Sequence, residues 1–147
     1  MEGPFNSQHM RSLQDLVLPR PADVYRIFMI GGSTAYGVGA PSPAGTISGH
    51  LEKILNEKGA AKNKRIEVLN ASVCAWSSTH ERIWIVNALS EWEPDLVLAL
   101  TGANDVIWGF SGSNIFNFRT WEDDLYLEAL NTALTMAGVR PFSTTLH

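Results

Sequence analysis

The sequence predicts a three-layer α/β/α fold around a parallel sheet. Short apolar runs of strand length alternate with longer segments that carry apolar residues at helical spacing. Such alternation is typical of parallel sheets with helices on both faces. The chain has 147 residues, 45% of them hydrophobic and 18% charged, which suits one globular core. We expect the flavodoxin-like strand order 2-1-3-4, with the fifth strand of such sheets missing.

The expected elements follow one another along the chain without repeats. They are strands at 25–30, 65–69, 96–100 and 139–146, and helices at 48–58, 78–92 and from Thr120 to Gly138. Residues 1–24 are interpreted as an amino-terminal extension, and residues 25–147 as one incomplete α/β domain.

Apolar spacing and end signals predict the helices. The first has Leu51, Ile54 and Leu55 on one face and Gly59 directly after its end. In the second, the segment 78–81 has capping-box spacing, and the residues Ile83, Val86 and Leu89 form the apolar stripe.

The third strand, 96–100, is the most apolar, so we expect it at the centre of the sheet. Residues 106–120 have no regular period but are rich in aromatic residues. A long irregular connection of this kind is usually a functional loop or a covering flap.

Composition argues against several function classes. A net charge of −4 and scattered Lys and Arg residues argue against nucleic acid as a partner. The single Cys74 excludes an intramolecular disulfide and a multi-thiolate metal site. No apolar run is long enough to span a bilayer, and the first residues lack a signal peptide's apolar region. Localisation stays open between cytoplasm and export, and the oligomeric state is unknown.

Polar and small residues follow each of the first three strands. Ser33 lies in the turn Gly31–Gly37, the second strand leads into Asn70–Trp76, and the third into Thr101–Asp105. The carboxyl ends of neighbouring parallel strands share one edge of the sheet, so we expect these segments to converge. A nucleophilic serine in acyl transfer needs donors for the developing oxyanion.

The donors that we predict are the side-chain amide of Asn104 and the backbone N–H groups of Ala75 and Ser33. The small residue Ala75 and the glycine Gly102 keep the pocket open for an ester.

These three segments resemble, in order and context, the first conserved blocks of the SGNH hydrolases, also called the GDSL esterase and lipase family. The resemblance covers about residues 26–146, and its strongest part is Gly102–Asp105 directly after an apolar strand. It implies Ser33 as nucleophile and first oxyanion donor, Asn104 as side-chain donor, and a small-molecule, carbohydrate or lipid ester as substrate. Residues 5–11 also look like an element that precedes this domain in some bacterial members.

The chain departs from the family pattern at three points. Gly32 stands where many members have Asp, and Ala75 where the second block usually has Gly. No Asp or Glu lies three residues before any histidine, so the Asp-x-x-His motif that carries the family's general base is absent; the histidines are His9, His50, His80 and His147. We therefore expect a truncated serine esterase with little activity of its own.

Other interpretations stay open. Ser33 also suits a turn, Asn104 and Asp105 an Asx turn, and His80 an exposed first helical turn. The same site would serve an O-acyltransferase or a non-catalytic binding module. Ser33 and Tyr36 interrupt the spacing of a Gly-x-Gly-x-x-Gly motif, and no Gly-Lys-Ser or Gly-Lys-Thr follows, so we predict no nucleotide cofactor. We also predict no other cofactor and no metal.

Overall fold

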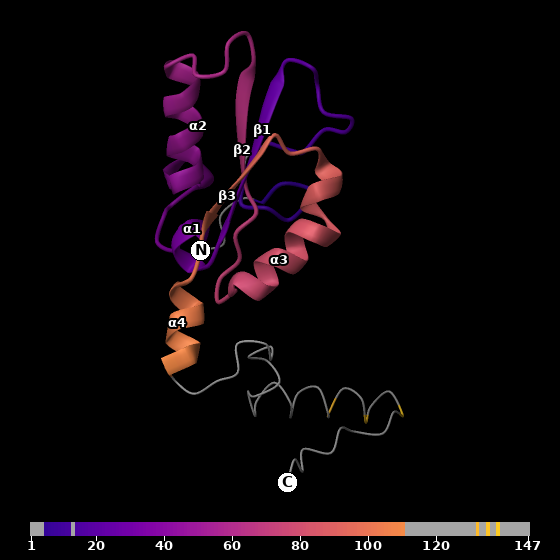
Figure 1. The fold of residues 1–147 in the computed structure, drawn as a ribbon, viewed down its shortest axis with the longest axis vertical. Coiled ribbons are helices and arrows are strands. Elements are labelled where there is room, and N and C mark those ends of the chain that lie inside the picture. Colours follow the sequence, from indigo (N-terminus) through magenta and orange to yellow (C-terminus); the bar gives the residue numbers. More distant parts are fainter. Residues whose placement is uncertain (1–4, 13, 111–131, 133–134, 136–137, 139–147) are drawn as a thin grey trace. The chain divides into compact units, whose positions relative to one another are not determined.

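A parallel sheet of three strands is the frame of this protein, seen in a computed structural model that describes residues 5–12, 14–110, 132, 135 and 138 (Figure 1). The strands are β1 (Val24–Gly31), β2 (Arg65–Asn70) and β3 (Leu96–Leu100), in the order β2-β1-β3. The parallel sheet and the expected 2-1-3 order are therefore confirmed. The fourth strand expected at 139–146, the stretch 111–120 and, apart from residues 132, 135 and 138, the helix expected from Thr120 lie outside the described residues.

The chain forms two compact units, residues 1–107 and 108–147. The first unit holds the sheet and the helices α1 (Ser33–Tyr36), α2 (Ile47–Glu57) and α3 (Ser78–Asn87), together with the short 3-10 turns η1 (Pro43–Gly45) and η2 (Leu89–Trp92). The helix α4 (Ala103–Phe110) begins in the first unit and ends in the second. No helix in the described part of the chain is both long and apolar enough to cross a bilayer.

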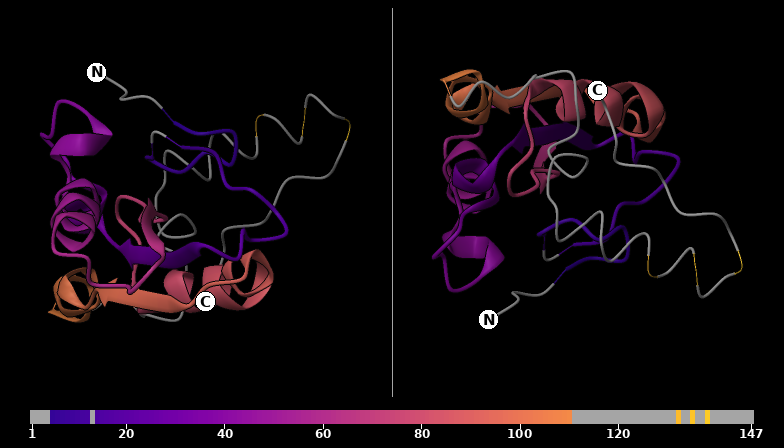
Figure 2. Two further views of the ribbon diagram at one scale, coloured as in Figure 1. Left: turned by 90° about the horizontal axis from the view of Figure 1, so that it is seen from above. Right: turned by 90° about the horizontal axis from the view of Figure 1, so that it is seen from below.

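Helices cover both faces of the sheet, which gives the expected three layers (Figures 1 and 2). On one face, Leu51 and Leu55 of α2 pack against a cluster that contains Ile27 and Met29 of β1. On the other face, the residues Trp84 and Ile85 of α3 pack on a cluster that contains Phe28. Alternate residues of β1 therefore point into two separate cores, as the pleat of a strand requires.

The centre of the described sheet is β1, whereas β3 was expected there. From Ile27 to Gly31, β1 pairs with β3, and from Val24 to Met29 it pairs with β2. Its residues are buried except for Tyr25, while Leu96 and Leu100 of β3 are exposed. The expected central position of β3 depends on the strand predicted at 139–146, which lies outside the described residues, so it stays a prediction.

The helices differ from the sequence prediction in their details. The cap of α3 is Ser77, one residue before the predicted one, and His80 completes the capping box. Ile83 and Val86 are exposed, and the neighbouring residues Trp84 and Ile85 face the core instead. The prediction that residues 106–120 are irregular is wrong for its first residues, because α4 continues to residue 110.

The described residues of the amino-terminal segment, 5–12 and 14–23, pack on the sheet. Met10 and Leu16 belong to the same buried cluster as Phe28 and Leu69. The buried Arg26 donates from Nε to Glu67 at 2.8 Å and from Nη2 to the backbone oxygen of Val17 at 3.0 Å.

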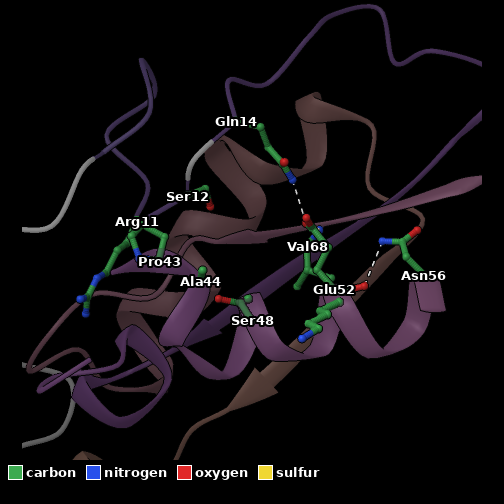
Figure 3. A pocket seen from close by; sticks show the side chains of 11 residues that line it. Arg11, Ser12, Gln14, Pro43, Ala44, Ser48, Glu52, Asn56 and Val68 are labelled. Carbon is green, nitrogen blue, oxygen red and sulfur yellow. Dashed lines mark hydrogen bonds between the residues drawn. The ribbon is translucent and has the colours of Figure 1, made fainter. Parts of the chain in front are cut away.

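Side chains of α2 form hydrogen bonds with the backbone groups at the outer edge of β2. The Asn56 amide bonds both backbone groups of Ile66, at 2.8 and 2.9 Å, and the Glu52 carboxylate accepts from the Val68 N–H at 2.7 Å. Glu52 also accepts from Gln14, and both residues line a pocket of about 270 Å³ between α2 and the amino-terminal segment (Figure 3). These side chains take the hydrogen bonds that another strand would otherwise make at this edge.

Candidate active site

The turn after β1 places Ser33 at the start of α1. A Cβ on Gly31 would lie 2.3 Å from the Leu100 oxygen of β3, so only glycine lets the two strands end this close together. Gly37 ends α1 in the left-handed region, at φ +85°, and its N–H donates to the Ser33 oxygen at 3.1 Å. The Ser33 side chain is exposed at this edge of the sheet.

The loop after β2 lies directly beside this turn. The Val73 N–H donates to the Gly31 oxygen at 3.0 Å, which continues the strand pairing beyond the end of β2. Ala75 then has a φ of +64°, in the left-handed region that favours glycine. An alanine therefore occupies a glycine conformation at the position predicted to donate its backbone N–H.

Asn104, in the first turn of α4, joins the two segments. Its Nδ2 donates to the Trp76 oxygen at 2.7 Å, and a Cβ on Gly32 would lie 2.7 Å from the same nitrogen. The amide thus points toward the residue that precedes Ser33. Gly102, at φ +100° with open space around it, makes the turn from β3 into α4.

The structure therefore brings the turn, the loop and Asn104 to one place at the carboxyl edge of the sheet. The N–H of Ala75, the amide of Asn104 and the hydroxyl of Ser33 come from the segments that follow β2, β3 and β1. Their catalytic roles stay predictions.

Asp105 binds the same loop one residue further on. Its carboxylate accepts from the Ser78 N–H at 3.1 Å and from the Ser78 Oγ at 2.6 Å. Burial would raise the Asp105 pKa, but the hydrogen bonds from Ser78 and the nearby His80 outweigh it, so the pKa lies below its ordinary value. Asn104 and Asp105 together bind the loop at Trp76 and Ser78, and the sequence pattern did not identify Ser78 as the partner.

Two further titratable residues of α3 lie next to this loop. The ring of His80 stacks on Trp76 at 5.8 Å, and its Nδ1 lies 2.9 Å from the Ser77 hydroxyl in the helix cap. Loss of water contact lowers the His80 pKa, against the opposing effect of Asp105. Burial raises the pKa of Glu81, which accepts from the Thr101 hydroxyl at 2.8 Å.

The described histidines occupy different places. His9 and His50 are exposed, and His80 uses Nδ1 in the cap of α3. His147 lies outside the described residues. The sequence and these positions thus leave the general base of the predicted mechanism unassigned.

Comparisons with known proteins identify structural neighbours. AlinE4, described as an SGNH-hydrolase family esterase, is 19% identical, with a TM-score of 0.51, over 82% of this chain and 58% of its own. TesA is 21% identical with a TM-score of 0.49, over 78% of this chain and 56% of its own. EstA, an esterase from Pseudoalteromonas sp., is 24% identical with a TM-score of 0.43, over 78% and 55%.

No family model and no curated protein matches the chain in sequence. The chain spans less than two thirds of the length of the neighbouring structures. At such identities a likeness describes the fold, and function has to be argued from the site. The chain has the α/β fold of an SGNH-hydrolase family esterase, AlinE4.

Proposed function

We propose that this chain carries the nucleophile and the oxyanion donors of a serine ester hydrolase. The supporting observation is the position of Asn104, whose amide nitrogen lies beside Gly32 and bonds the Trp76 oxygen at the same time. A donor between the serine turn and the neighbouring loop is what stabilisation of a tetrahedral oxyanion requires.

In the proposed reaction the Ser33 hydroxyl attacks the ester carbonyl, and its proton passes to a base. The oxyanion that forms accepts hydrogen bonds from the N–H groups of Ser33 and Ala75 and from the Asn104 amide. The alkoxide leaves with a proton, and water hydrolyses the resulting acyl-serine. The substrates are carboxylic esters of small molecules, with O-acetyl and lipid-like esters suggested by the family resemblance.

The base is the part of the mechanism that stays unassigned, because the sequence contains no Asp-x-x-His motif. Ser33 without a base is a weak nucleophile at neutral pH, so we propose that the chain by itself reacts slowly. An added small base, imidazole, is then expected to increase the rate at Ser33.

Labelling with a fluorophosphonate tests this proposal. We expect a slow modification that mass spectrometry locates at Ser33, that accelerates with imidazole and that is lost in Ser33→Ala. Asn104→Ala is expected to slow the labelling about 100-fold, because one oxyanion donor is worth about that factor. The control is Ser90→Ala, since this exposed hydroxyl donates to the Val86 oxygen at 3.1 Å on α3 and is not part of the predicted site.

Equal labelling of Ser33 and of other exposed serines would contradict the nucleophile assignment. That result would favour the alternative of a non-catalytic binding module. The alternative of an O-acyltransferase needs a separate assay with an ester substrate. Transfer of the acyl group from unlabelled, acylated Ser33 to a sugar hydroxyl in preference to water would identify that activity.

A further inference from the structure

We infer that Arg11, outside the segments predicted to form the site, is a positioning residue for the Ser33 turn. Its guanidinium donates to the oxygens of Tyr36 at 3.2 Å, Gly37 at 2.5 Å and Ala40 at 2.5 Å. The group also lies over the Tyr36 ring, 4.9 Å from its centre. Only 5% of Arg11 is exposed, so these bonds are shielded from water.

The turn needs such support because α1 has only four residues. A single helical turn is unstable by itself, since few hydrogen bonds offset the loss of backbone freedom. Its own bonds run from the N–H groups of Tyr36, Gly37 and Val38 to Gly32 and Ser33. No further helical turn follows whose N–H groups could donate to the carbonyls at the end of α1 and just after it. Arg11 donates to three of these carbonyls.

A second side chain binds the same turn from the sheet. The buried Asn70, at the end of β2, donates from Nδ2 to the Ala35 oxygen at 3.1 Å and the Tyr36 oxygen at 3.3 Å. Its own N–H donates to the Ser12 hydroxyl at 2.9 Å. Arg11 and Ser12, neighbours in sequence, thus bind both the turn and the residue that supports it.

Asn6 keeps this part of the amino-terminal segment in place. Its Oδ1 accepts from the N–H groups of Gln8 at 3.2 Å and Met10 at 2.8 Å, and its Nδ2 donates to the Gln14 oxygen at 3.1 Å. The loop that Asn6 organises ends at Arg11 and Ser12, at one end of the pocket shown in Figure 3. Ser33 is therefore positioned from residues that lie more than 20 places earlier in the sequence.

Arginine suits this role better than lysine. Its planar guanidinium presents several N–H groups in a fixed arrangement, so that Nη1 reaches two carbonyls while Nη2 reaches a third. Among the described residues no carboxylate forms an ion pair with Arg11, and the carbonyls of the turn are its acceptors. Lysine would keep the charge but not this geometry.

The experiment compares the full chain with its variants Arg11→Gln and Arg11→Lys. In Arg11→Gln we expect hydrogen exchange at the amides of Gly37, Val38 and Ala40 to accelerate about tenfold, while the amides of β1 and β2 keep their protection. The rate of fluorophosphonate labelling at Ser33 is expected to fall about tenfold, and Arg11→Lys to lie between that variant and the wild type in both measurements.

The matched control is Arg20→Gln. Arg20 forms a partly buried ion pair with Asp95 at 2.8 Å and donates to the Val24 oxygen, at the start of β1. This variant loses a comparable arginine, so we expect lower global stability with unchanged exchange in the Ser33 turn. A similar acceleration in the turn would overturn the role of Arg11, because the effect would then be general.

The inference rests on the proposed function only for the role of Ser33. If the wild type is not labelled at Ser33, the proposed function fails, while hydrogen exchange still tests the contact. If Arg11→Gln does not fold, Arg11→Lys carries the test. Wild-type exchange in the turn of a folded Arg11→Lys variant overturns the inference, and faster exchange confined to the turn supports it.

Discussion

The Ser33 turn and the loop from Ala75 to Ser78 meet at Asn104, yet they are fixed in different ways. The turn is bound by two buried side chains, Arg11 and Asn70, which are 5% and 0% exposed. The loop is bound by Asn104 and Asp105, which are half-buried, and it contains an alanine at a positive φ.

This difference predicts that substitutions in the turn destabilise the fold more than substitutions in the loop do. Buried hydrogen bonds to a charged donor are stronger than bonds that compete with water, and breaking them leaves unsatisfied groups. The Ser33 turn is therefore fixed by the core, whereas the loop from Ala75 to Ser78 can change at less cost to the fold.

The largest effect is expected from Gly31→Ala in the turn. The new Cβ would lie 2.3 Å from the Leu100 oxygen and 2.6 Å from the Ala35 Cβ, so the ends of β1 and β3 have to separate. We expect the free energy of unfolding, measured by urea denaturation, to fall by about 3 kcal/mol. The control Gly39→Ala, also at positive φ but with no atom within 4 Å, is expected to cost only about 1 kcal/mol. Equal losses in the two variants would show that close packing at Gly31 is unimportant.

A smaller effect is expected from Asp105→Asn in the loop, at about 1 kcal/mol, because water competes for these bonds. The Asp105 pKa lies below the ordinary value of 3.8, so its contribution is complete above that pH. The contribution is lost as the pH falls through the lowered pKa of the folded protein. Hydrogen exchange at the Ser78 amide is expected to accelerate in the variant at neutral pH, and in the wild type only in strong acid.

The control for this prediction is Asp23→Asn, which removes the same charge from an exposed position just before β1. We expect no change at Ser78 in this control. A Ser78 amide that stays protected in Asp105→Asn would show that Asn104 alone fixes the loop.

The smallest effect is expected from Ala75→Gly. Glycine adopts a φ of +64° without the strain that a Cβ causes, so we expect the free energy of unfolding to rise by less than about 1 kcal/mol. Ala44→Gly in η1, where φ is not positive, is expected to lower it by about 0.5–1 kcal/mol. Both changes are measured by thermal denaturation, and a loss of stability in Ala75→Gly would argue against strain at this position.

The strands and the residues that leave them were predictable from the sequence. An apolar run followed by Gly31, Gly32 and Ser33 is a local pattern, and local patterns depend on the pleat and on turn geometry. Alternation of strands and helices then requires that the carboxyl ends of the strands meet at one edge. The convergence of the predicted site residues follows from these two facts.

Only the tertiary structure decided which face of α3 is buried, since Ile83 and Trp84 are both apolar and differ only in what packs against them. It also decided the partners of Arg11, Asn70 and Asp105, which lie 25 or more residues away in the sequence. A polar side chain carries no sign of a distant acceptor in its neighbours along the chain, because such bonds form only once the strands are paired and the core is closed.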